Sequence, residues 1–550
     1  MRKITITLAL CVCAIISASA EEYRTVIAPL EGECWWGGIV NKGYVQPYFN
    51  FNRSDSKLSF AKDQSRSDQA APFNLSDQCC GGATMPLLLS SKGRYVWSDR
   101  PFKYEFTDGV LILYSKYEKI SVVSAGSTLK EAYKDACAKH FPFDGREPAE
   151  LMFTKPQFNN WIESAIFGIT QENAEKYVDD LAKSGFPCGV LMIDGGWQRY
   201  HGRRDFNPDT FPAPNRLTDK IHGYGYKSVF WVSYFISGDA RPEYREWQPS
   251  QKNLLVRSKT NPKEAALVYW WNGISVTMDL TRDDIRQQFI DILKECQEKY
   301  GIDGFKFDGG NPEYFRGNAI FSEPWMEPVD FSHAYNLVGE SFPYHEFRSG
   351  FKTGGHPIIQ RLHDVGHSWF ELKTIIPNCA IAGLVGYPYT FADMIGGGLA
   401  GSFRPGAQFS HKLFIRSCQA QALMPMMQFS VAPWRVLTEE ECAICKKFAE
   451  LHVQFGPYIM EQVHLAAKTG EPIMRTMEYE FPGKGYEKVN QQFMLGPKYL
   501  VAPVVDEDDS KVIELPAGKW KDDLGKIHKG PVRLELKNVP LDRLPYFEKL

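Results

Sequence analysis

The chain has 550 residues, too many for one hydrophobic core, so two to four domains are expected. An apolar fraction of 43% predicts ordered globular structure, and a net charge of −3 gives no reason to expect a nucleic acid or an anionic membrane as a partner. Aromatic residues make up 14% of the sequence, which suits carbohydrate binding because rings stack on the C–H faces of sugars, although large β-rich cores would give the same content.

Residues 1–20 have the pattern of a secretory signal peptide. Arg2 and Lys3 form a positive end, an apolar stretch follows at 4–16, and small residues at 18–20 supply a cleavage site. The apolar stretch is too short to span a bilayer and no other stretch is long enough, so no membrane insertion is expected. We therefore expect an exported protein, either periplasmic or extracellular.

Ten of the twelve cysteines lie beyond this segment, and export would permit disulfides, but their spacing defines no framework. Adjacent Cys79 and Cys80 could form a strained mutual bond or find separate partners. Cys442 and Cys445 have CxxC spacing on an expected helix, where we interpret them as ordinary helix residues, because no second Cys pair or nearby His stands at ligand spacing. We predict no metal site and no cofactor.

Short strand patterns separated by turn residues predict an N-terminal β-sandwich domain over residues 21–155. The strands are expected at 44–51, 87–89, 94–97, 102–106, 110–115 and 120–123. A helix is expected at 129–138, before a proline-containing linker around 141–156.

From residue 156 to 460, strand and helix patterns alternate. Strands are expected at 160–168, 188–193 and 227–235, and helices at 173–184, 217–222, 411–423 and 439–455. A helix that opens with a capping box at Thr281 and Asp284 leads into a buried strand at 304–307. Repeated βα units predict an α/β fold, and the absence of a glycine-rich phosphate loop after any strand favours a (β/α)8 TIM barrel over a doubly wound sheet.

Beyond residue 461 the strand patterns return. They predict a small C-terminal β domain, a second sandwich over 461–550, with strands at 473–479, 492–495, 499–505, 512–515 and 532–536.

Four aspartates follow expected barrel strands: Asp194, Asp308, Asp364 and Asp393. Catalytic groups of α/β barrels lie at the carboxyl ends of the strands. Several acids at one barrel mouth, with Arg348 and many aromatic residues, fit glycoside hydrolysis, in which one carboxylate attacks or stabilises C1 and a second protonates the leaving oxygen. Asp308 precedes two glycines and is our first candidate nucleophile or general base, although it could instead cap the next turn.

Three motifs together resemble glycoside hydrolase family 31. They are KFDGG at 306–310, an aspartate five residues before a tryptophan at 364 and 369, and GYPYTFADMIGGG at 386–398. The similarity covers roughly residue 158 to the C-terminus, including LVAPVV and LPAGKW. WWNG at 270–273, RLHD and MPMMQFSVAPW most resemble the α-galactosidase-like branch of the myogenesis-regulating glycosidase.

The resemblance implies a retaining exo-α-glycosidase. Asp308 matches the nucleophile, which forms a covalent glycosyl-enzyme intermediate, and Asp364 matches the acid/base. A retaining mechanism requires the two carboxyl groups to lie about 5 to 5.5 Å apart. It also requires the pKa of Asp364 to be raised enough to keep this residue protonated.

The same resemblance suggests substrate-binding residues. Arg348 matches the arginine that binds a hydroxyl of the terminal sugar, Asp194 and Asp393 match sugar-binding aspartates, and Trp271 falls where the branch places an aromatic ring at the first subsite. Lys306 shares a face of its strand with the nucleophile and could reach a sugar hydroxyl. Each has a structural alternative: ion pairing for Lys306 and Arg348, core packing for Trp270 and Trp271, support of the glycine turn for Asp393, and helix capping for Asp194.

One segment departs from the family pattern. Many α-glucosidases of the family carry Arg-Asn-His after the penultimate barrel strands, whereas residues 427–430 here are Met-Gln-Phe-Ser. The missing His contact weakens the case for glucose. His363 and His367 flank the acid/base candidate and could tune it or pack structurally.

We therefore expect a secreted enzyme acting on terminal sugars of an oligosaccharide or α-glycoside, α-galactosides first and α-glucosides next. A lyase that eliminates instead of adding water, or a sugar-binding protein without catalysis, are the alternatives. The oligomeric state is not predicted.

Overall fold

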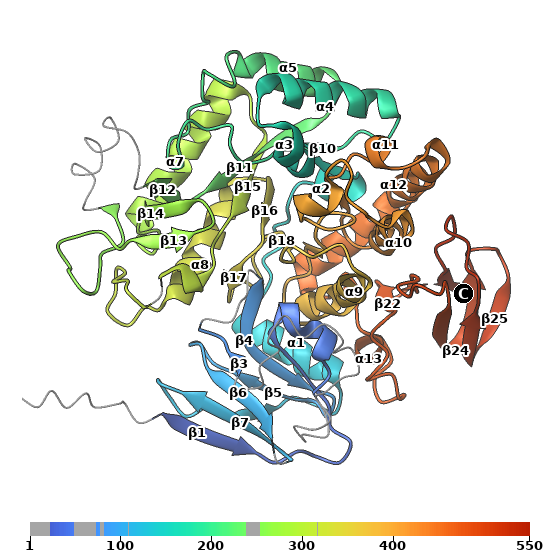
Figure 1. Ribbon diagram of the computed structural model, residues 1–550. Helices are drawn as coiled ribbons and strands as arrows, with labels where there is room; N and C mark the ends of the chain where they lie inside the picture. The colour runs from blue at the N-terminus through green and yellow to red at the C-terminus, as the bar shows by residue number, and fades with distance from the viewer. Residues whose placement is uncertain (1–21, 49–72, 77–81, 108, 238–253, 316) are drawn as a thin grey trace, which may run out of the picture.

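The computed structural model describes residues 22–48, 73–76, 82–107, 109–237, 254–315 and 317–550. Residues 49–51 of the expected strand at 44–51 fall outside these residues, as do Cys79 and Cys80, whereas residues 44–45 belong to a 3-10 helix, η1 (Val40–Val45), instead of a strand. The described chain forms antiparallel sheets near the N-terminus, a parallel barrel and a C-terminal β domain (Figure 1). No helix among the described residues has both the length and the apolar character needed to cross a bilayer.

Eight parallel strands form the barrel sheet. In spatial order they are β19 (Thr390–Phe391), β18 (Gln360–Arg361), β16 (Tyr344–Phe347), β15 (Gly304–Asp308), β11 (Lys227–Ser233), β10 (Val190–Ile193), β9 (Gln157–Asn159) and β20 (Gln428–Phe429). Beyond β19, the backbone N–H of Ile395 donates to the carbonyl of Gln428 in β20 at 2.8 Å, which joins the two edges of the sheet. The predicted TIM barrel is confirmed.

Helices cover the outside of this sheet (Figure 1). Thr170 caps the first turn of α4 by accepting from the N–H of Asn173, and Gly185 ends α4 in the left-handed conformation. Gly301 ends α7 in the same way. The main helices of this part are α3 (Trp161–Phe167), α4 (Gln171–Ser184), α5 (Pro214–Gly223), α7 (Asp283–Tyr300), α8 (Pro328–Leu337), α9 (Trp369–Leu384), α10 (His411–Ala422), α11 (Pro433–Val436) and α12 (Glu439–Thr469).

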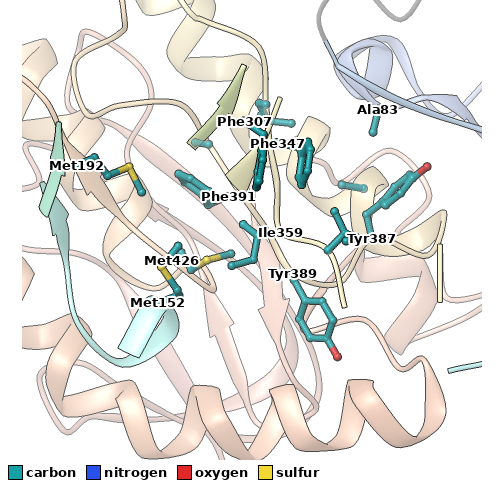
Figure 2. Packing of buried hydrophobic residues seen from close by; sticks show 14 of the residues in the cluster. Ala83, Met152, Met192, Phe307, Phe347, Ile359, Tyr387, Tyr389, Phe391 and Met426 are labelled. Carbon is teal, nitrogen blue, oxygen red and sulfur yellow. The ribbon is translucent and has the colours of Figure 1, made fainter. Parts of the chain in front are cut away.

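Strand β15 is fixed in the barrel by close packing on β16. The rings of Phe307 and Phe347 stack with their centroids 4.6 Å apart (Figure 2). Gly304 has no room for a side chain, because a Cβ there would lie 1.9 Å from the carbonyl oxygen of Tyr344. After Asp308, Gly309 and Gly310 take φ values of +85° and +84°, so the chain turns sharply and leaves the Asp308 side chain at the barrel mouth.

Two antiparallel sheets lie before the barrel. One contains β1 (Tyr23–Ile27), β7 (Val110–Ser115), β6 (Lys103–Thr107) and β3 (Phe73–Asn74), and the other contains β2 (Trp35–Ile39), β4 (Ala83–Ser90), β5 (Arg94–Trp97) and β8 (Val122–Ser124). Helices α1 (Leu129–His140) and α2 (Leu151–Thr154) follow.

The second of these sheets shares a core with the barrel. Strand β17 (Gly350–Phe351), which comes from the barrel segment, pairs in parallel with β4. Ala83 of β4 and Tyr387, which follows α9, belong to one buried cluster (Figure 2), and the Tyr387 hydroxyl donates to the Thr84 carbonyl at 2.8 Å. The N-terminal sheets are thus held firmly against the barrel.

The C-terminal strands form one antiparallel sheet around Trp520. The strands are β21 (Met474–Arg475), β22 (Phe493–Leu495), β23 (Tyr499–Val501), β26 (Tyr546–Lys549), β24 (Lys511–Asp522) and β25 (Ile527–Leu536). Buried Arg416 of α10 connects this sheet to the barrel by donating to Asp509 at 2.7 Å and to the carbonyl of Pro540 at 3.2 Å.

Several predicted elements are wrong in detail. Residues 160–168 are helical instead of extended, because the first barrel strand ends at Asn159 and the Asn159 side chain accepts from the N–H of Trp161. Helix α7 begins after Arg282, and the Thr281 hydroxyl donates to Asp279, so the predicted capping box does not form. The expected strand at 473–479 is shorter, β21 at Met474–Arg475, and overlaps helix α13 (Met477–Glu480), and α12 continues past residue 455 to residue 469.

Cysteines in the described residues are free thiols. They are Cys34, Cys137, Cys188, Cys296, Cys379, Cys418, Cys442 and Cys445. Cys442 and Cys445 lie on helix α12, as the sequence predicts.

Candidate active site

Asp308 is held at the end of β15 by two hydrogen bonds and one ion pair. The indole Nε1 of Trp231 donates to its Oδ2 and the N–H of Gly309 to its Oδ1, both at 2.8 Å. The Nε of Arg348 forms an ion pair with Oδ1, also at 2.8 Å. Burial raises the pKa of Asp308, but Arg348 and Lys306 outweigh burial and hold it below its ordinary value, so the carboxylate is ionised.

Arg348 connects the two candidate catalytic carboxyl groups. It lies between β16 and β17, and its Nη1 donates to Oδ2 of Asp364 at 3.2 Å while its Nε contacts Asp308. One guanidinium therefore stands between Asp308 and Asp364. The two predicted catalytic residues are 56 positions apart in the sequence, and the structure brings both into contact with the Arg348 side chain.

Asp364 follows β18 and is the most open of these groups, with 39% of its side chain exposed. Nη1 of Arg361 donates to its Oδ1 at 2.9 Å. Burial raises the pKa of Asp364, but Arg361 and Arg348 outweigh burial and lower it. The raised pKa that the sequence led us to expect is thus absent from the substrate-free site, because two guanidinium groups contact this carboxylate.

Asp393 lies behind Asp364 with no exposed surface. Its Oδ1 accepts from Nη1 of Arg361 at 2.6 Å and its Oδ2 from the N–H of Val365 at 2.8 Å. Burial is the main cause that raises the pKa of Asp393 to about 7. The contact of Asp393 with a sugar stays a prediction, and its contact with Val365 matches the alternative role of holding the loop.

Lys306 and Asp194 form an ion pair in the barrel interior. Lys306 Nζ donates to Oδ2 of Asp194 at 2.8 Å, and both side chains are almost fully buried. Burial lowers the pKa of Lys306, but Asp194 outweighs burial and raises it, so the lysine stays charged. The ion-pair alternative for Lys306 is therefore realised, and contact of either residue with a sugar stays a prediction.

Trp270 and Trp271 have different environments although they are adjacent. Trp270 is 8% exposed, stacks on Phe235 with centroids 4.1 Å apart and donates to Ser275, so it is a core residue. Trp271 is 51% exposed, and the Cζ atom of Arg348 lies 4.8 Å from the centre of its ring. Only Trp271 is placed to meet a ligand above Arg348.

Family models match most of the described fold. The glycosyl hydrolases family 31 TIM-barrel domain matches residues 157–462, and the family 31 C-terminal domain matches residues 470–549. The chain belongs to glycosyl hydrolase family 31. The predicted family is therefore confirmed.

Named relatives within family 31 cover different activities. The mouse "Myogenesis-regulating glycosidase" is 29% identical over 439 residues, which are 77% of this chain and 60% of the relative. The "Alpha-glucosidase" of Saccharolobus solfataricus is 23% identical over 64% of this chain and 56% of the relative. The chain thus spans less than two thirds of the length of either protein.

A solved family 31 structure supports the fold. The Flavobacterium johnsoniae GH31 dextranase, complexed with glucose, superposes with a TM-score of 0.79 at 20% identity, covering 96% of this chain and 66% of the dextranase. At this identity the similarity supports the architecture alone.

Two residues of the site were missed by sequence reasoning. Trp231 is aligned with Lys306 across β11 and β15, so the strand register could have revealed it as a neighbour of Asp308. Arg361 precedes Asp364 by three residues, and only the fold shows that its guanidinium turns inward between two aspartates. Trp231 lies in no motif of the resemblance, and Arg361 lies in RLHD, where only Asp364 had been given a role.

The segment that departs from the family 31 pattern lies inside the barrel. Gln428 is fully buried, and its amide donates to Glu346 at 2.8 Å and to Gln157 at 3.1 Å. His367 bonds the carbonyl of Gly396 at 2.8 Å and accepts from the N–H of Ser410 at 3.1 Å, so it supports the loop after β18 instead of facing Asp364. Within the described chain, no group of three or more His, Cys, Asp or Glu side chains could hold a metal ion.

Proposed function

We propose that this chain is a retaining exo-α-glycosidase that hydrolyses terminal α-linked sugars, with α-galactosides preferred and α-glucosides next. The observation that carries the proposal is the Arg348 guanidinium, which contacts both Asp308 and Asp364. Retaining glycosidases need their two carboxyl groups about 5 to 5.5 Å apart, and carboxyl groups that share one guanidinium are suited to that separation.

Asp308 serves as the nucleophile in this proposal. Its lowered pKa keeps it ionised, and the Trp231 indole orients it. Its carboxylate attacks C1 of the terminal sugar, the bond from C1 to the leaving oxygen breaks, and Asp364 gives that oxygen a proton. Asp364 then takes a proton from water, whose oxygen attacks C1 and releases Asp308, so the anomeric configuration is retained.

Asp364 must be protonated before the first step, and substrate binding contributes part of the required rise in its pKa. Arg348 contacts Asp364 in the free site. A sugar hydroxyl that accepts from Arg348 weakens this contact and removes one cation from the carboxylate. The pKa of Asp364 then rises towards the range in which it donates a proton.

The choice of galactose first rests on the interior segment around Gln428 and on the resemblance of the sequence motifs to the α-galactosidase-like branch of the family. The segment has no histidine at 427–430 that could contact glucose hydroxyls. The Saccharolobus solfataricus relative, named for α-glucosidase activity, makes the α-glucoside the second candidate. We also propose that the signal-like residues 1–20 direct export to the periplasm or beyond the cell.

The test is hydrolysis of p-nitrophenyl α-galactoside and α-glucoside by the wild type and by Asp308→Ala and Asp364→Ala. We expect the galactoside to be cleaved, NMR to detect the α-anomer as the first product, and Asp308→Ala to lose activity by several orders of magnitude. Asp364→Ala should lose less on nitrophenyl substrates, because their leaving group needs little protonation. Asp209→Ala, which changes an exposed carboxylate elsewhere, should match the wild type.

Other results would redirect the proposal. Cleavage of the glucoside alone would keep the mechanism and change the sugar. An anhydro sugar as product would indicate elimination, and a β-anomer as first product would indicate inversion. Glycan binding without turnover, unchanged in Asp308→Ala, would indicate a sugar-binding protein.

A further inference from the structure

The guanidinium of Arg361 connects three carboxylates from three different segments. It is almost fully buried, and its Nη1 contacts Asp364 at 2.9 Å and Asp393 at 2.6 Å. Its Nε forms an ion pair with Oε1 of Glu346, on β16, at 3.3 Å. Asp364 is the only one of these three carboxylates that is substantially exposed, so Arg361 ties an exposed acid to two buried ones.

Glu346 is itself fixed by the barrel interior. Its Oε2 accepts from the amide of Gln428, on β20, at 2.8 Å. Arg361 is thereby held from one side by Glu346 and from the other by Asp393, which is anchored to the N–H of Val365. If the Arg361 side chain moved with Asp364 towards the solvent, the buried carboxylates of Glu346 and Asp393 would lose their cation, which is costly.

Charge is unbalanced around this cluster. Three cations face five carboxylates; the cations are Lys306, Arg348 and Arg361, and the carboxylates are Asp194, Asp308, Glu346, Asp364 and Asp393. A buried cluster with an excess of carboxylates favours the uptake of a proton. Whether Asp364 or one of its neighbours holds that proton depends on how strongly each carboxylate interacts with the positive charge of Arg361.

We propose that Asp393 and Glu346 are positioning residues for glycoside cleavage, which act on Asp364 through the guanidinium of Arg361. The proposal rests on the proposed function, because it concerns the group that donates the proton. Both side chains are buried, so in this proposal neither touches the substrate. Each competes with Asp364 for one buried cation, so each tunes the proton affinity of the acid/base.

The direction of the effect follows from the charges. The positive charges of Arg361, Arg348 and Lys306 lower the pKa of Asp364, and the negative charge of Asp308 raises the pKa of Arg361. Replacing Asp393 or Glu346 with its neutral amide leaves these groups in place but removes one anion. The pKa of Asp364 then falls, whereas replacing Arg361 with Gln removes a cation and raises it.

The experiment is the pH dependence of kcat/KM on the glycoside that the wild type cleaves. The alkaline limb of this profile reports the acid of the free enzyme. We expect Asp393→Asn and Glu346→Gln to move this limb to lower pH by about one unit, and Arg361→Gln to move it to higher pH. Asp303→Asn is the matched control, because Asp303 pairs with Lys227 at the opposite end of β15, and it should leave the limb in place.

Opposite shifts cannot arise from a general loss of folding. If Asp393→Asn does not fold, the shift of the alkaline limb in Glu346→Gln tests the proposal instead. Profiles of the two amide variants that superimpose on the wild type would overturn the inference while leaving the proposed function intact. A wild type that cleaves no glycoside would overturn the proposed function, and this inference with it.

Discussion

Gly398 lies where a methyl group would press on the carboxylate of Asp393, next to the proposed acid/base Asp364. A Cβ on Gly398 would stand 2.8 Å from Oδ2 of Asp393 and 3.4 Å from Cβ of Asp364. Gly398 is not among the glycines with positive φ, so the backbone itself accepts alanine. The effect of Gly398→Ala therefore comes from contact and not from backbone strain.

Neither side of this contact can move freely. Oδ2 of Asp393 is held by the N–H of Val365, and the N–H of Gly398 donates to the Val365 carbonyl at 3.0 Å. The Gly398 carbonyl accepts from the indole of Trp161 at 2.8 Å. The Asp393 carboxylate must then shift by a few tenths of an ångström, and Arg361, which contacts both Asp393 and Asp364, transmits this shift to Asp364. Since a misplacement of about 1 Å can cost about 100-fold in rate, we expect kcat to fall about tenfold, which is roughly 1.4 kcal/mol in the barrier.

The assay compares kcat and melting temperature for the wild type, Gly398→Ala and Gly401→Ala. Gly401 lies three residues further along, with no atom within 4 Å of its ideal Cβ and no positive φ, so its variant should match the wild type. Gly398→Ala should also lose about 1–3 kcal/mol of stability through overpacking. A Gly398→Ala enzyme with kcat within twofold of the wild type would refute the contact between the loop and the carboxylates.

Two further predictions concern stability. Lys306→Met leaves the buried carboxylate of Asp194 without its cation, so the free energy of unfolding measured in urea titrations should fall by about 3–5 kcal/mol. The double variant with Lys306→Met and Asp194→Asn should recover part of this loss. A loss below about 1 kcal/mol in the single variant would contradict a buried ion pair. His356 and Arg146 hold the pKa of Glu340 at about 2, against an ordinary value of 4.5, so Glu340 stabilises the fold above pH 4.5 and this contribution is lost as the pH falls towards 2. Glu340→Gln should therefore melt below the wild type at pH 7, and the gap should close at low pH; a gap independent of pH would contradict the pairing.

The sequence predicted the parts of the fold that carry local signals. The buried strand before Asp308 is flanked by glycines and follows a long amphipathic helix, and both elements form where expected. Helix α4 has a threonine cap and a terminal glycine, so it too was predicted within two residues. Asp308 and Asp364 could be proposed as a pair because each stands in a separate motif after a barrel strand, and the structure connects them through Arg348.

The sequence could not predict strands that are too short to show a period. Strands β18, β19 and β20 have two residues each, and β9 has three. Alternation of apolar residues needs about four positions to be recognised, so the prediction at 160–168 mistook a helix for the first strand. These short strands form because their neighbours in the barrel bond them, which is tertiary information.

The charge state of Asp364 shows why a motif can identify an acid/base without describing its chemistry. The raised pKa that acid catalysis needs depends on Arg361, Glu346 and Arg348, which come from different strands and turns. Their distances follow from strand register, and register is set by the whole barrel. In the free site the two guanidinium groups dominate and keep Asp364 ionised. Under the proposed function, substrate must engage Arg348 before Asp364 donates a proton, so we expect substrate binding and activation of the acid to be coupled through this arginine.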